Sequence, residues 1–177
     1  MKDNIKIVDS VPQDVFGIRN VQRITWIDTY PNAGLNILKE DVESEFSKDD
    51  TEEGRKRIEG WKKLYSNSNM RRWVAKKGSD IIGFCSAVKE NEGNRIYAIY
   101  VLPEFQRQGL GKKLMEKALV WLGREKDIYV NSASYNIQAL KFYEKFGFNK
   151  SSRSVNSTVE PLPTGKAIPE IEMVKKA

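Results

Sequence analysis

The fold is decided by residues 96–119, which read IYAIYVLPEFQRQGLGKKLMEKAL. Residues 96–102 are mainly β-branched, aromatic or aliphatic, which predicts a strand. Pro103 has no N–H to donate to a sheet, so we expect the strand to end before it. Apolar residues then recur at helical spacing over residues 110–122, which predicts a helix that begins at or near the glycines.

The junction between this strand and this helix is suited to binding an anion. The first turn of a helix leaves N–H groups without intrahelical partners, and the aligned peptide dipoles add partial positive charge. Gly109 and Gly111 have no Cβ, so a phosphate can approach the main chain. Full positive charges stand beside them on Arg107, Lys112 and Lys113. We interpret the junction as a pyrophosphate site; a helix start with incidental glycines and a solvated basic face is the alternative.

Two blocks of the chain carry a family resemblance. A Rossmann loop would need a glycine where this chain has Leu114, and the Walker A spacing is also absent. Residues 106–111 read Q-x-x-G-x-G, which resembles the acetyl-coenzyme A motif of the GNAT N-acetyltransferase superfamily, Q/R-x-x-G-x-G/A. Residues 136–148 read N-x-x-A-x-x-F-Y-x-x-x-G-F, which resembles the later motif of that superfamily. With the flanking strands, the similarity covers residues 5–174.

The resemblance implies an α/β (α+β) chain with the GNAT fold. That fold is a mixed, strongly twisted sheet of about seven strands, with helices on both faces and a V-shaped split between the central parallel strands. Residues 1–177 are long enough for one domain and short for two, so a single domain is expected. Residue patterns predict strands at 5–11, 72–76, 81–88, 96–102, 127–132, 148–155 and 170–175. They predict helices at 12–30, 35–46, 51–65, 110–123 and 136–146, with a cap at Asp50 or Thr51.

The resemblance also assigns residues to acetyl-coenzyme A, the implied cosubstrate. They are Ile99, Tyr100 and Val101 in the strand, Arg107, Gln108, Gly109, Leu110, Gly111 and Lys112 in the loop and helix start, and Asn136 and Tyr143 in the second block. Main-chain groups of Ile99 and Val101 are expected to bond the pantetheine, while their side chains are core. The amides of residues 107–112 are expected to hold the pyrophosphate. Asn136 has an alternative role as an ordinary helix N-cap.

Tyr143 matches the family position that gives a proton to the departing coenzyme A thiolate. The parent thiol has a pKa of roughly 8.5, so a donor near the sulfur assists the departure. The alternative is a packing aromatic, since Tyr143 lies on a helical line with Leu140 and Phe146.

No general base is assigned. An alkyl amine with a pKa of about 10.4 is mostly protonated at neutral pH and must lose a proton before it attacks. Many relatives carry a glutamate on the strand before the phosphate loop, but residues 95–98 of this chain are RIYA. Glu170, Glu172 or a bound water are substitutes, and surface placement is the alternative for both carboxylates.

The acceptor implied is a small-molecule amine. Within the superfamily, the chain is most similar to PaiA-type spermidine/spermine acetyltransferases, through Thr29-Tyr30, the helical insert after it and residues 99–106. A cationic polyamine needs carboxylates and aromatic faces around it, and such residues lie close together in sequence at Trp26, Asp28, Tyr30, Glu40 and Asp41. The alternative is a pair of amphipathic helices with exposed acidic residues. A protein N-terminal acetyltransferase of the ribosomal-protein type and a non-catalytic coenzyme A-binding regulator stay open.

Composition excludes several classes of site and partner. The chain has no histidine, which excludes Ser-His and Cys-His catalysis and a His-ligated zinc site, and we expect no metal. Its single cysteine, Cys85, lies in an apolar strand and is expected to be structural. The 30 basic residues are interleaved with 24 acidic ones, so the net charge of +6 does not indicate nucleic acid. No apolar run reaches the ~20 residues of a membrane span and no secretory signal is evident, so a cytoplasmic protein is expected. A homo-oligomer stays open.

Overall fold

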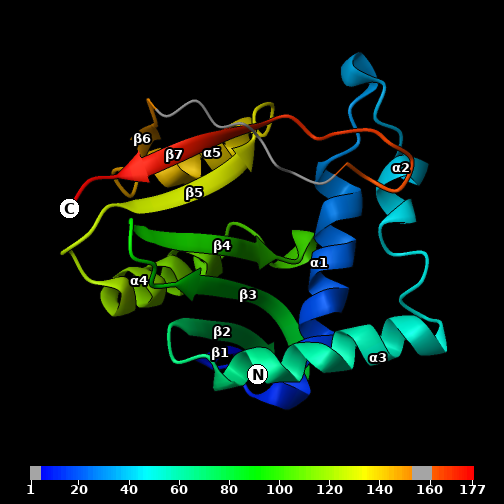
Figure 1. The fold of residues 1–177 in the computed structure, drawn as a ribbon, viewed down its shortest axis with the longest axis horizontal. Helices are drawn as coiled ribbons and strands as arrows, with labels where there is room; N and C mark the ends of the chain where they lie inside the picture. Colours follow the sequence, from blue (N-terminus) through cyan, green and yellow to red (C-terminus); the bar gives the residue numbers. More distant parts are fainter. Residues whose placement is uncertain (1–4, 153–160) are drawn as a thin grey trace.

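The computed structural model describes residues 5–152 and 161–177. Within them, one mixed sheet has the strand order β1-β2-β3-β4-β5-β7-β6 (Figure 1). Its strands are β1 (Ile5–Asp9), β2 (Met70–Lys77), β3 (Asp80–Val88), β4 (Asn94–Val101), β5 (Ile128–Ala133), β6 (Asn149–Lys150) and β7 (Glu170–Lys175). Neighbouring strands are antiparallel except β4 and β5, which are parallel. The predicted fold class is confirmed.

Helices flank both faces of this sheet. The α-helices are α1 (Val15–Thr29), α2 (Lys39–Ser44), α3 (Glu52–Gly60), α4 (Leu110–Leu122) and α5 (Ile137–Glu144), and short 3-10 turns are η1 (Pro12–Asp14), η2 (Ala33–Leu35), η3 (Trp61–Ser66) and η4 (Pro103–Phe105). The helix α1 contacts β3 and β4 and carries α2 and α3 beside it, whereas α4 packs behind β2, β3 and β4 (Figure 1). Among the described residues, no helix combines the length and apolar character that crossing a bilayer requires.

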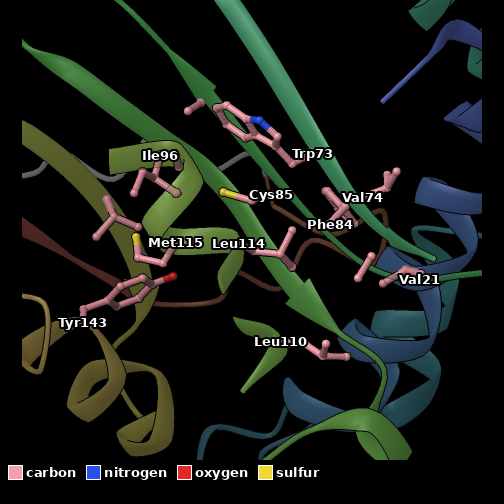
Figure 2. Close-up of a cluster of buried hydrophobic side chains, with 14 of the residues drawn as sticks. Val21, Trp73, Val74, Phe84, Cys85, Ile96, Leu110, Leu114, Met115 and Tyr143 are labelled. Atoms are coloured by element: carbon pink, nitrogen blue, oxygen red, sulfur yellow. The ribbon is translucent and has the colours of Figure 1, made fainter. Parts of the chain in front are cut away.

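The main core lies between α4 and the sheet. The predicted apolar stripe of α4 is buried, at Leu110, Leu114, Met115, Ala118 and Leu122. Figure 2 shows Leu114 and Met115 beside Cys85 of β3 and Ile96 of β4. Burial of this stripe fixes the position of α4, and hence of its first turn, against the central strands.

The central parallel strands separate early. β4 pairs with β5 only through Asn94, Arg95 and Ile96, and the ladder between β3 and β4 skips Tyr97, which forms a β-bulge there. Residues 97–101 continue along β3 without pairing to β5 in the described chain. The V-shaped split expected between these strands is confirmed.

Three predicted elements differ from the structure. The helix expected over residues 51–65 is α-helical only to Gly60 and continues as the 3-10 turn η3. The helix expected over residues 35–46 is wrong in its first half, because Asn36 takes a left-handed conformation (φ 53°) and Asn32 bridges to Ile37, so α2 begins only at Lys39. The strand expected over residues 148–155 is reduced to β6, and its last three residues lie outside the described part. The predicted Thr51 cap is confirmed: its hydroxyl accepts from Gly54 N at 3.1 Å.

Leu114→Ala should lower the free energy of unfolding by about 2–5 kcal/mol, because it deletes a fully buried side chain. Val120→Ala in the same helix should change it by less than about 0.5 kcal/mol, because Val120 is 84% exposed. Urea unfolding followed by circular dichroism measures both values. Equal losses would contradict the packing of α4 described above.

Candidate active site

The start of α4 offers main-chain donors to an anion. The first helical hydrogen bond runs from Lys113 N to Gly109 O at 3.1 Å, so the amides of residues 110–112 precede the hydrogen-bonded ladder. Gly109 is the N-cap at φ +80°, a left-handed conformation that favours glycine. A Cβ placed there would meet no atom within 4 Å, so the approach to the main chain is open at this residue. The side chains of Arg107 and Lys112 are exposed beside it.

Side-chain hydrogen bonds hold the loop before α4 in place. Gln106 Nε2 donates to Val101 O at 3.0 Å, and Gln138 Nε2 of α5 donates to Gln106 Oε1 at 3.2 Å. Gln108 Nε2 donates to Glu104 O at 3.2 Å. The first turn of α4 is therefore tied to the end of β4 and to α5.

The open edge of β4 presents main-chain groups to the split. Leu102 N donates to Ile82 O of β3 at 2.9 Å, and alternate residues of an antiparallel strand point their polar groups in opposite directions. The N–H and C=O groups of Ile99 and Val101 therefore point away from β3. The structure places these two residues as the sequence predicts, with their main chains at the split and their side chains partly buried against the core.

One groove joins these features. It has a volume of about 1150 Å³ and is lined by residues from both sides of the sheet, including Asp28, Tyr30, Tyr100, Gly109, Asn131 and Tyr143. Residues of α1 stand at one side, and those of α4 and α5 at the other. The split between β4 and β5 thus gives a passage through the sheet.

Tyr143 lies on α5 at the wall of this groove. It is 6% exposed, and its ring packs edge-on against Phe142 and Phe148. Figure 2 shows the ring beside Met115, with the hydroxyl directed into the molecule. Burial raises the pKa of this phenol, so the hydroxyl keeps its proton at neutral pH. Tyr143 is therefore a packing aromatic whose hydroxyl is protonated at neutral pH.

Asn136 and Cys85 have structural roles in this arrangement. Asn136 Oδ1 accepts from Ala139 N at 3.1 Å, so it is the N-cap of α5 as well as a residue of the groove wall. The Cys85 side chain is fully buried in the main core, and burial raises the pKa of its thiol. The prediction of a structural cysteine is confirmed.

Two tyrosine hydroxyls meet on the α1 side of the groove. Tyr30 Oη and Tyr100 Oη are 3.0 Å apart, and Tyr135 Oη donates to the main-chain oxygen of Tyr30 at 2.7 Å. Burial is the main cause that raises the pKa of both Tyr30 and Tyr100. From the sequence we predicted Tyr100 for the coenzyme site and Tyr30 for the amine site. No local sequence pattern predicts that their two hydroxyls meet.

The residues predicted for the amine side separate into two groups. Asp28 and Tyr30 line the groove. Trp26 packs behind them, with its ring centroid 5.2 Å from that of Tyr30, and Glu40 is exposed on α2.

Asp41 belongs to the second group, because its carboxylate holds the start of α2. Its Oδ2 accepts from Leu38 N at 2.7 Å and lies 3.1 Å from Lys166 Nζ. The Leu38 amide is the main cause that lowers the pKa of Asp41, and Lys166 adds to it. This carboxylate is engaged in the fold rather than in the groove.

Known proteins share this fold and these motifs. The model of the acetyltransferase (GNAT) family matches residues 35–148. The peptidyl-lysine N-acetyltransferase YjaB of Salmonella typhimurium is 33% identical over 93 residues, which span 51% of this chain and 59% of that protein. The PaiA N-acetyltransferase of Thermoplasma acidophilum, solved with coenzyme A, superposes with a TM-score of 0.73 at 21% identity, over 98% of this chain and 99% of that chain. The ribosomal-protein-S18-alanine N-acetyltransferase of Escherichia coli gives a TM-score of 0.63 at 16% identity, over 97% and 93%.

The family match spans both sequence motifs and the strands and helices on the β4, α4, β5 and α5 side of the groove, while α1 precedes the matched residues. The relatives have a coenzyme A complex among them, and the donors at the start of α4 suit the phosphates of that molecule. The chain therefore belongs to the acetyltransferase (GNAT) family, which uses acetyl-coenzyme A as its acetyl donor.

Proposed function

We propose that this protein transfers the acetyl group of acetyl-coenzyme A directly to a primary amine, with a polyamine such as spermidine as the favoured acceptor. One observation carries the proposal: the donors at the start of α4 and the open edge of β4 border the same groove. A single coenzyme A molecule can therefore meet the helix start with its diphosphate and the strand edge with its pantetheine arm.

The residues of the site fit this cosubstrate. The amides of residues 110–112, the dipole of α4 and the charges of Arg107 and Lys112 attract the diphosphate. The main-chain N–H and C=O of Ile99 and the N–H of Val101 offer a strand-like edge to the amide groups of the pantetheine, while the Val101 carbonyl accepts from Gln106.

Tyr143 is proposed as the proton donor to the leaving thiolate. Its raised pKa keeps the phenol neutral, so the hydroxyl is available as a donor across the neutral range. Tyr143 lies on the α4 and α5 side of the split, and the turn proposed to bind the phosphates lies on the same side.

A cationic acceptor suits the opposite side of the groove. Asp28 contributes a carboxylate to its wall, and Tyr30 and Tyr100 contribute aromatic surface. The structural likeness to the PaiA acetyltransferase agrees with the polyamine that the sequence resemblance implies.

A protein amine is the second candidate acceptor. The relative with 33% identity is named as a peptidyl-lysine acetyltransferase, and one structural neighbour is named as an acetyltransferase of the alanine of ribosomal protein S18. A lysine side chain and a polyamine both present a primary amine on a flexible alkyl chain, so the same groove suits either.

A thiol-release assay with acetyl-coenzyme A should show turnover with spermidine above that with a lysine-containing peptide or a peptide with an N-terminal alanine. Mass spectrometry of the products checks that one acetyl group has been added to an amine. Higher turnover with either peptide would show that the preferred acceptor is a protein amine and not a polyamine. Binding of acetyl-coenzyme A in calorimetry without transfer to any amine would contradict the enzymatic proposal and favour a regulator.

Gly109→Ala should weaken acetyl-coenzyme A binding by at least about tenfold, since a methyl group at the N-cap obstructs the diphosphate and the left-handed φ strains an alanine. Gly123→Ala is the matched control, because Gly123 also has φ +80° and open space around it but lies at the other end of α4. It should lose stability and keep its affinity. Calorimetry measures the binding, and equal affinities in the two variants would exclude the phosphate role of the helix start.

Tyr143→Phe should lower kcat by on the order of 10²-fold, because it removes the proton donor, and should leave acetyl-coenzyme A binding nearly unchanged. Tyr129→Phe is the control: this buried tyrosine of β5 donates to Asp127 at 3.3 Å, away from the groove. Steady-state kinetics and calorimetry separate the two effects. A kcat equal to that of the wild type would retire Tyr143 as the acid.

A further inference from the structure

The open end of the split lacks the main-chain ladder that holds neighbouring strands together. In the described chain, the last pair between β4 and β5 is Ile96 with Val130. Tyr100 lies four residues beyond this pair on the β4 arm, and Tyr135 lies five residues beyond it on the chain that leaves β5. An unbroken ladder would hold the two arms about 4.8 Å apart. Other contacts must therefore set their distance here.

Tyr30 contacts both arms of the split. Its hydroxyl lies 3.0 Å from the Tyr100 hydroxyl on β4, and its main-chain oxygen accepts a hydrogen bond from the Tyr135 hydroxyl at 2.7 Å. The helix α1, which ends at Thr29, runs past the carboxyl end of β4 and brings Tyr30 to this place (Figure 1). Tyr30 thus connects the β4 arm to the β5 arm where the ladder is missing.

Both points of attachment are themselves held in place. Tyr135 belongs to the turn that ends β5, in which Asn136 N donates to Ala133 O at 3.0 Å. On the other arm, the Tyr100 ring packs against that of Phe84 of β3, with 5.6 Å between the ring centroids. Each arm therefore offers a fixed point to which α1 can be attached.

Tyr30 is fixed in turn by α1. It is the C-cap of this helix, and its N–H donates to Trp26 O at 2.9 Å. Its ring packs edge-on against the Trp26 ring. Burial raises the pKa of the Tyr30 and Tyr100 phenols, so both are protonated at neutral pH and one hydroxyl donates to the other. The contact between the helix and the β4 arm is therefore present under working conditions.

The same contacts border the path of the acceptor. Tyr30 and Tyr100 line the groove together with Asp28, the carboxylate at the end of α1, whereas Tyr135 lies outside the set of described residues that line it. A change in the distance between the arms would move this wall, and Asp28 with it, relative to the edge of β4 proposed for the pantetheine.

A second link joins the arms on the coenzyme side. Gln138 Nε2 of α5 donates to Gln106 Oε1, which follows β4, at 3.2 Å. Apolar packing of α4 against the sheet also persists there. Loss of the Tyr30 contacts should therefore change the alignment of the two sides without unfolding the protein.

We infer, on the basis of the proposed function, that Tyr30 is a positioning residue: it sets the distance between the two arms of the split and so aligns the amine with the thioester. Acetyl transfer requires the nitrogen and the carbonyl carbon to meet in a narrow range of geometries, and a misplacement of about 1 Å can cost on the order of 10²-fold in rate. The Tyr135 hydroxyl serves the same alignment through Tyr30.

Tyr135→Phe is the sharpest test, because it removes a hydrogen bond to Tyr30 and leaves the described side chains of the groove wall unchanged. Its kcat should fall at least about tenfold. The factor should be the same with each acceptor that the wild type uses, spermidine or the lysine-containing peptide, since the alignment serves any amine. Steady-state kinetics measures kcat and KM, and calorimetry should give the wild-type affinity for acetyl-coenzyme A.

A double-mutant cycle tests the contact with the β4 arm. Tyr30→Phe and Tyr100→Phe each remove the hydrogen bond between the two hydroxyls. The double variant should therefore lower kcat by no more than the larger of the two single effects. Losses of kcat that multiply would show that the two hydroxyls act separately, and they would overturn the inference.

Tyr65→Phe is the matched control. The Tyr65 hydroxyl also bonds to a hydroxyl far away in sequence, that of Ser10, at 2.6 Å, but neither residue is among the described residues that line the groove. Tyr65→Phe should lose stability in urea unfolding, as Tyr135→Phe does, and keep the wild-type kcat. The comparison separates alignment of the reactants from a general loss of stability.

A wild-type kcat in Tyr135→Phe, or a raised KM with unchanged kcat, would overturn the inference while leaving the proposed function intact. A loss of kcat with only one of two acceptors that the wild type uses would do the same, because it would indicate contact with that acceptor. A wild-type protein that acetylates neither spermidine nor the peptides would overturn both.

Discussion

The short ladder between β4 and β5 is the constraint on which the site depends. Main-chain polar groups in a sheet need partners, and β4 pairs with β3 from Arg95 to Val101, apart from the bulge, but pairs with β5 only from Asn94 to Ile96. The bulge at Tyr97 coincides with the point of separation. From there on, the strand has an edge that does not pair with β5, and the groove lies along this edge.

The two sides of the split differ in charge, and the difference follows from the elements that border them. The first turn of α4 brings unpaired amides, Arg107 and Lys112 to one side. Asp28 contributes a carboxylate to the other side, which Tyr30 and Tyr100 also line. The anionic cosubstrate and the cationic acceptor proposed above would therefore approach from opposite sides of the split, so that neither would compete for the place of the other.

Local patterns predicted the strand, loop and helix around Gly109 well, because apolar periodicity, Pro103 and the glycines all act within a few residues. The prediction of a helix over residues 35–46 was wrong for an equally local reason, because Asn36 takes a left-handed conformation. The meeting of Tyr30 with Tyr100 could not be read from sequence, since it depends on how α1 packs across the sheet. The burial of Glu172 likewise could not be predicted, because it depends on the register between β7 and β5 and on the ion pair with Arg95 of β4.

The complete burial of Cys85 has a practical consequence. Because it is the only cysteine, the native molecule presents no accessible thiol to aromatic disulfide reagents, and the colour that develops during turnover comes from the released cosubstrate alone. The unfolded chain, by contrast, exposes this atom. The rate at which Cys85 is labelled in the absence of cosubstrate would therefore report how often the core between α4 and β3 opens.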